Sequence, residues 1–199
     1  MHNNIIGVIV SKLLRKLRML FIQHELQRTA QNLVAANIKN GEHVLVVSSS
    51  DQSKELIDAI VTAASSTGAA SVSAIIIACP EVLRDYKHPP AVIASVESAD
   101  LTIVATSLRF PRAYDDLSEA LFKAGKRQVL INNAPLEDFT RGASLADPIK
   151  LNRRTHALAA KISKGKTVRV TSGNGTDLSV KVCRPCIALT GRAEVDTGF

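Results

Sequence analysis

VLVVSS, residues 44–49, is an unbroken apolar run that is closed by two serines. Such a run is typical of a strand buried on both faces of a parallel sheet. Similar runs begin at residues 72, 101 and 129, so that successive starts are 28, 29 and 28 residues apart. Helical patterns fill the intervals, and right-handed βαβ crossovers of this length give a parallel sheet covered by helices. We therefore predict a doubly wound, Rossmann-like α/β domain with a mainly parallel sheet.

Glycines and polar capping residues mark the ends of the expected helices. The helix before the first strand ends at Asn40-Gly41, and two later helices end at Gly68 and Gly125, because glycine accepts the conformation that follows many helix C-termini. Residues 49–51 (Ser-Ser-Asp) are expected to cap the helix after the first strand. Surface loops are expected at 81–90 and 133–148, and a last helix with an apolar face follows from residue 151 to residue 162.

Near residue 165 the pattern changes to TVRVTSGNGTDLSVKV (167–182), in which apolar and polar residues alternate around a Gly-Asn-Gly turn. This alternation predicts an antiparallel hairpin. Both apolar sets share one face if Val170 lies opposite Leu178, which leaves 173–175 as a loop with a left-handed glycine. We divide the chain into a basic amphipathic extension (1–22), the α/β domain (23–164) and the start of an incomplete second domain (165–199).

The net charge of +7 is concentrated in two segments. Residues 5–22 carry four cations before the first acid, Glu25, and these charges exclude a membrane-spanning helix. The segment is either a membrane-surface helix or an upstream extension of a reading frame that starts at Met19, and we favour the extension. The second basic run, residues 150–169, is typical of a solvated helix face. We therefore expect neither nucleic acid nor a membrane as a partner, and keep a polyanion-binding module as the non-enzymatic alternative.

The sequence lacks recognisable catalytic, metal-binding and phosphate-binding motifs. Cys79, Cys183 and Cys186 are too few for a disulfide framework and indicate a reducing, cytoplasmic location. The CxxC of residues 183–186 lacks the second pair that a zinc site needs. The five histidines form no ligand-spaced pair, and neither a GxSxG elbow nor a phosphate-binding glycine motif occurs. We expect no catalytic and no metal-binding residue in this chain.

Polar residues follow each predicted strand. The carboxyl ends of parallel strands form the edge at which doubly wound sheets bind ligands. Hydroxyls and amides at this edge suit a polar ligand, and they also suit the caps and turns that we favour for them. No substrate-binding residue is singled out among these strand-end residues, which are Ser48-Ser49-Ser50, Ala78-Cys79, Thr106-Ser107 and Asn132-Asn133.

Residues 36–199 resemble the amino-terminal part of the aminopeptidase T (leucyl aminopeptidase) family and of its relatives, the 2,5-dihydroxypyridine 5,6-dioxygenases. The matching pieces are IKNGEHVLVVSS, GAASV, SADLTIVATS and KTVRVTSGNGTDLSVKV. The tetrapeptide Gly175-Thr176-Asp177-Leu178 is the most specific of them. The aminopeptidases have a long Trp-containing insertion before this hairpin, and this chain contains no Trp. The resemblance is therefore stronger to the dioxygenase branch.

The resemblance implies a metalloenzyme whose His and Asp or Glu ligands lie in the carboxy-terminal half of family members. A full-length relative would use Fe(II) to cleave an aromatic ring or, alternatively, divalent ions to hydrolyse a peptide. We expect no cofactor and no substrate in this chain, which we interpret as a fragment or truncated product that is inactive alone. Its 175–178 motif is expected to be structural, with Thr176 and Asp177 bonded to the turn backbone, and a homo-oligomer is compatible with the sequence.

Overall fold

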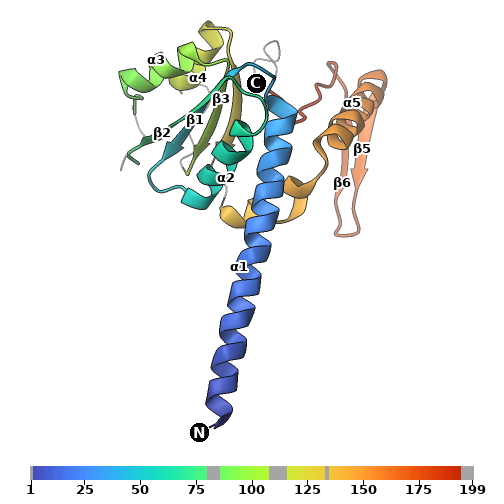
Figure 1. Cartoon of the computed structure of the whole chain (residues 1–199). Coiled ribbons are helices and arrows are strands. Elements are labelled where there is room, and N and C mark those ends of the chain that lie inside the picture. Colours follow the sequence, from blue (N-terminus) through green and yellow to red (C-terminus); the bar gives the residue numbers. More distant parts are fainter. Residues whose placement is uncertain (1, 80–85, 108–115, 133–134, 194–199) are drawn as a thin grey trace. The chain divides into compact units, whose positions relative to one another are not determined.

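The computed structural model describes residues 2–79, 86–107, 116–132 and 135–193 (Figure 1). The chain forms two compact units. The first contains the residues up to Leu145 together with Ala193, and the second spans Ala146–Arg192. A four-stranded sheet lies in the first unit and a two-stranded hairpin in the second.

The sheet of the first unit is entirely parallel, with the order β2-β1-β3-β4. The predicted strands are confirmed to within two residues at each end. The central strands β1 and β3 are buried almost throughout, whereas the edge strand β2 is largely exposed and Ile76 retains 65% of its accessible surface. An apolar run thus identifies a strand without showing its place in the sheet. The strands are β1 (His43–Ser49), β2 (Ser71–Ile77), β3 (Leu101–Thr106) and β4 (Arg127–Asn132).

Helices cover both faces of this sheet, which confirms the doubly wound prediction (Figure 1). One core cluster joins α1 and α2 to side chains such as Val46 and Ile103. The other joins α3 and α4 to side chains such as Val47 and Val104. Neighbouring residues of one strand therefore enter opposite cores, as the period of two requires. The helices are α1 (His2–Asn37), α2 (Lys54–Ser65), α3 (Pro90–Ser98) and α4 (Asp116–Lys123).

Two segments differ from their sequence interpretation. The basic segment 5–22 and the helix expected after Glu25 are one continuous helix, α1, because no proline or helix-ending glycine separates them. The loop expected at 133–148 contains two short 3-10 helices, η2 (Leu136–Phe139) and η3 (Gly142–Leu145). Thr29 of α1 donates its hydroxyl hydrogen to the carbonyl of Phe139 at 2.7 Å, so this segment is anchored to α1.

The second unit contains α5 (Pro148–Lys164), β5 (Thr167–Thr171) and β6 (Asp177–Lys181). Asp147 caps α5 by accepting the N–H groups of residues 149 and 150. The hairpin has the predicted register, with Val170 opposite Leu178. Gly175 supplies the left-handed position of the loop, at φ +91°. The apolar face of the hairpin remains about half exposed.

Candidate functional site

The topology of the sheet singles out one place at its carboxyl edge. The chain passes from β1 to β2 on one side of β1 and then returns to β3 on the other side. Open α/β sheets bind ligands at such a reversal, in the crevice outside the strand ends. Ser49 is the last residue of β1, and Ser107 directly follows β3. Polar side chains of this chain therefore meet where the fold class places ligands.

Hydrogen bonds join the ends of three strands at this edge. The N–H of Ser107 donates to Oγ of Ser49 at 3.1 Å, and the Ser107 hydroxyl donates to the carboxylate of Asp51. From the end of β2, the N–H of Cys79 donates to Oγ of Ser50 at 3.1 Å. We refer to Ser49, Ser50, Asp51, Cys79 and Ser107 as the strand-end cluster.

The contacts of the strand-end cluster set the charge of its two titratable groups. Hydrogen bonds from Ser107 and then Ser49 lower the pKa of Asp51, whose side chain lies at the exposed edge. Partial burial, reinforced by the neighbouring Asp51 carboxylate, raises the pKa of the Cys79 thiol. At neutral pH the cluster therefore presents one carboxylate, several hydroxyls and a protonated thiol. This set binds polar groups and provides no thiolate nucleophile.

The cap predicted at residues 49–51 is wrong. Ser53 caps α2 instead, because its Oγ accepts the N–H of Leu56 at 3.3 Å. Residues 49–51 lie too early in the chain to reach the first turn of α2, since β1 continues to Ser49. Their polar side chains are thereby left to join neighbouring strand ends.

A buried histidine–carboxylate pair lies beside this edge. Nδ1 of His88 is 2.6 Å from Oδ1 of Asp116, and Oδ2 of Asp116 accepts the backbone N–H of His88 at 3.0 Å. The His88 side chain is only 1% exposed. Burial opposes ionisation of Asp116, but the two bonds from His88 outweigh it and lower the Asp116 pKa. The pair joins the entrances of α3 and α4.

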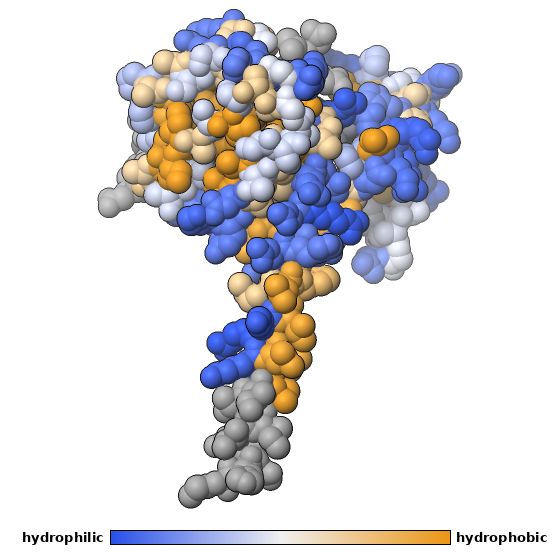
Figure 2. Space-filling view, viewed as in Figure 1, coloured by the Kyte–Doolittle hydropathy of each residue, from blue (hydrophilic) through white to orange (hydrophobic). Residues whose placement is uncertain are grey.

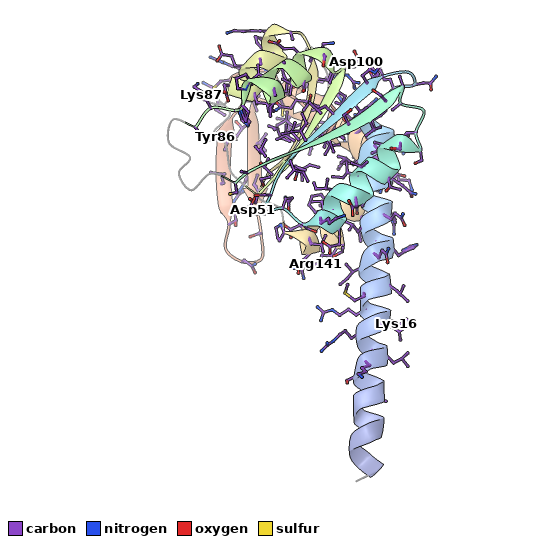
Figure 3. The ribbon with its side chains drawn as sticks, turned by 60° about the vertical axis from the view of Figure 1, so that its left-hand side comes forward. Lys16, Asp51, Tyr86, Lys87, Asp100 and Arg141 are labelled. Atoms are coloured by element: carbon purple, nitrogen blue, oxygen red, sulfur yellow. The ribbon has the colours of Figure 1, made fainter. Side chains whose placement is uncertain are left out.

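Tyr86 connects the buried pair to the strand ends. Its ring meets the His88 ring edge-on, with 5.2 Å between ring centres. Burial raises the Tyr86 pKa, and the Asp116 carboxylate raises it further. Figure 3 shows Tyr86 and Asp51 at one end of the strands and Asp100 at the other.

Sequence reasoning missed the His88–Asp116 pair. The two residues are 28 positions apart and belong to no ligand-spaced motif. The available signal was their place in successive βα connections, just before α3 and at the start of α4. The surface loop expected at 81–90 is confirmed over its described residues 86–89, except that the His88 side chain is buried. Residues 80–85 lie outside the described part of the chain.

Among the other strand-end residues, the Ser48 hydroxyl donates to the carbonyl of Ser49 at 3.4 Å. Ser48 and Thr106 are buried within the sheet, and Asn133 lies outside the described residues, as does the side chain of Asn132. Cys183 and Cys186 are exposed free thiols. Within the described ranges, no three His, Cys, Asp or Glu side chains are arranged to hold a metal ion.

The 175–178 motif lies at the tip and start of β6. Asp177 accepts two hydrogen bonds of 2.8 Å from the Arg169 guanidinium, and this contact lowers the Asp177 pKa. The N–H of Thr176 donates to Oγ of Ser172 at 3.3 Å. The side chain that bonds to the turn backbone is therefore that of Ser172, whereas Asp177 braces the opposite strand.

Comparisons with known proteins identify the family. The family model described as NicX, 2,5-dihydroxypyridine 5,6-dioxygenase, matches residues 25–196. The chain belongs to the NicX family. A search of curated proteins found no match.

A solved structure of a dioxygenase agrees with the fold of this NicX-family chain. The 2,5-dihydroxypyridine dioxygenase of Pseudomonas putida KT2440 is similar with a TM-score of 0.53 and 18% identity, over 86% of this chain. That similarity covers 52% of the dioxygenase, so the chain spans about half the length of its structural relative. The Argonaute of A. aeolicus also matches, with a TM-score of 0.40, 17% identity and coverage of 76% and 24% of the two chains. That likeness is too weak to bear on fold or function.

Proposed function

We propose that this chain is the α/β domain of a metal-dependent enzyme resembling 2,5-dihydroxypyridine 5,6-dioxygenase, and that it is inactive alone. The family match over residues 25–196 carries the proposal. The compact path from β4 to the hairpin supports the dioxygenase rather than the leucyl aminopeptidase alternative. In this view the domain positions a polar aromatic ligand, and Fe(II) supplies oxygen activation.

The described residues do not fit the iron itself. Non-haem Fe(II) enzymes that activate oxygen hold the metal with two histidines and one carboxylate. The strand-end cluster offers one carboxylate and hydroxyls, and the His88 ring is buried against Asp116. We therefore assign the metal ligands to the other half of a complete enzyme, as the family resemblance implies, and derive no step through iron from this chain.

The strand-end cluster has the chemical groups needed to bind the aromatic substrate of such an enzyme. A dihydroxylated pyridine is planar and carries hydroxyl hydrogens, which a carboxylate accepts well. Asp51 remains ionised at neutral pH and is oriented by Ser107. We infer that Asp51 accepts a hydrogen bond from the ring, while Ser49 and Ser107 hold the carboxylate in place.

Titration of the labelled chain with 2,5-dihydroxypyridine tests this assignment by NMR. We expect the amide signals of the strand-end cluster to move, and Asp51→Asn to weaken binding roughly tenfold by removing a charge-assisted hydrogen bond. Asp58→Asn, which changes an exposed carboxylate on α2, is the matched control and should leave binding unchanged. Shifts confined to other residues, or equal binding by the Asp51 variant, would contradict the proposal.

Two alternatives predict different results in the same preparations. An aminopeptidase domain would bind leucine p-nitroanilide in preference to the pyridine. A polyanion-binding module would use the exposed cations of α5, and its binding to heparin would fall steeply with salt. Neutralising those cations would abolish heparin binding; the residues are Arg153, Arg154 and Lys161.

A further inference from the structure

The amino-terminal half of α1 carries an exposed apolar stripe. With 3.6 residues per turn, its six apolar side chains fall within an arc of about 120°. Each retains between 48% and 61% of its accessible surface. Figure 2 shows them as a continuous hydrophobic column along one side of the helix. The apolar stripe consists of Val10, Leu13, Leu14, Leu17, Leu20 and Phe21.

Cations lie on the remaining circumference of the helix, where Met19 is also exposed. All four are exposed, and no acid precedes Glu25 in the sequence. Lys16 and Arg18 lie beside the two edges of the stripe, where a long side chain can extend past an apolar surface and keep its charge in a polar layer. We call this set the α1 cations: Lys12, Arg15, Lys16 and Arg18.

The apolar stripe is not a continuation of the core-facing side of α1. Leu26, Ala30 and Val34 are buried against the sheet. At 100° per residue, the direction they define lies about 140° from the centre of the stripe. A groove of about 520 Å³ beside α1 and α2 is lined by Met19 and Ile22, which lie outside the stripe, and by Leu20, at the edge of the stripe. The sheet and α2 therefore leave most of the stripe uncovered.

We propose that residues 10–21 of α1 bind the surface of an anionic lipid membrane. The helix would lie in the interface, with the apolar stripe among the upper acyl chains and the α1 cations on lipid phosphates. A stripe of this width bordered by lysine and arginine is typical of interfacial helices. Among the described helices, none has a stretch that is both long and apolar enough to span a bilayer.

Charge decides between a membrane and a second copy of the chain. Pairing two stripes would bring eight cations together, four from each copy, with no acid on this part of either helix to compensate them. An anionic surface instead complements every one of them. The sequence alone favoured no membrane partner, because it did not show that the stripe faces away from the core.

Vesicle flotation of the full chain tests the proposal. We expect binding to vesicles made of equal parts phosphatidylcholine and phosphatidylserine, and roughly tenfold weaker binding to phosphatidylcholine alone. Leu13→Gln with Leu17→Gln should weaken binding roughly tenfold or more by removing apolar contacts. The matched control is Arg153→Gln with Arg154→Gln on α5, another exposed basic helix, and should bind as the parent does.

A fluorescence measurement keeps the test independent of those variants. The chain contains no Trp, so Leu14→Trp introduces a single probe within the stripe. Its emission should shift to shorter wavelength on anionic vesicles, whereas Leu158→Trp, at an equally exposed site on α5, should not shift. Undiminished vesicle binding by the Leu13→Gln, Leu17→Gln variant would overturn the proposal. Loss of vesicle binding in the Arg153→Gln, Arg154→Gln variant would also overturn it. A third result would favour a second copy of the chain instead. In that case the parent is a dimer by light scattering and does not bind vesicles, and the Leu13→Gln, Leu17→Gln variant is a monomer.

Discussion

Arg127 holds together three segments at the amino edge of the sheet. Its guanidinium lies 2.5 Å from the carboxylate of Glu42 and donates to the carbonyl of Asn37 at 2.7 Å. Only 7% of the Arg127 side chain and 15% of the Glu42 side chain are exposed. A buried charge of this kind is tolerated because every partner is present. Removing one partner of the Arg127–Glu42 pair should therefore destabilise the fold more than removing both.

Arg127→Met should lower the free energy of unfolding by about 3–4 kcal/mol, because it leaves the Glu42 carboxylate buried and unpaired. Urea titration followed by circular dichroism measures the loss. Adding Glu42→Gln to Arg127→Met should restore part of the stability. An unchanged unfolding midpoint in Arg127→Met would show that the Arg127–Glu42 pair does not contribute to stability.

Asp116 should make stability depend on acid pH. Hydrogen bonds from His88 lower its pKa in the folded chain despite burial. The unfolded chain therefore binds the proton more tightly, so the contribution of Asp116 is present above its ordinary pKa and is lost as pH falls through the lowered value. Asp116→Asn should cost about 1–2 kcal/mol at neutral pH and progressively less below about pH 4.

Unfolding midpoints measured from neutral to acid pH test this prediction, with Asp58→Asn as the exposed control. The control should follow the parent curve because the Lys54–Asp58 pair is solvent-exposed. A constant difference between Asp116→Asn and the parent across the whole range would contradict the assignment.

At the residue scale, the sequence predicted which polar groups sit at the strand ends but not what they do. Ser and Asp suit both a helix cap and a cross-strand hydrogen bond, so residues 49–51 gave no means of choosing. The choice depended on where β1 ends, and Ser53 became the cap. The His88–Asp116 pair is tertiary and has no local pattern at all.

Elements with strict local geometry were the most predictable. The register of the hairpin followed from two local features, the alternation of apolar residues and the position of the Gly-Asn-Gly turn. Alternation requires the numbers of paired residues to add to an even sum, and the turn selects Val170 opposite Leu178. The continuity of α1 was less evident, because its two halves have apolar faces that point in different directions and the amphipathic signal partly cancels along its length. The exposure of β2 depended on sheet order, which strand patterns do not contain.

Gly175→Ala should destabilise the hairpin by about 1 kcal/mol. The added Cβ meets nothing within 4 Å, so the cost is the left-handed backbone at φ +91° alone. Gly173 also has open space but lacks a positive φ, and Gly173→Ala is the matched control with little effect. Hydrogen exchange of residues 167–181 measures both variants. Equal protection in the two variants would show that the left-handed turn is not the determinant.

At the scale of the whole molecule, periodicity predicted the layered sheet because βαβ units repeat at a nearly constant interval. The strand order was not predictable, since the same interval fits several orders of a doubly wound sheet. That order is what places Ser49, Asp51 and Ser107 at the reversal between β1 and β3. The chain belongs to the NicX family and spans about half the length of a structurally similar dioxygenase.

Anaerobic Fe(II) titration of the purified chain, followed by oxygen and 2,5-dihydroxypyridine, tests the central claim most directly. We propose that this chain provides the folded α/β domain and that the metal-binding residues belong to another part of the enzyme. We predict a folded protein with no stoichiometric iron and no ring cleavage. One Fe(II) bound per chain, together with catalytic loss of the pyridine, would contradict it.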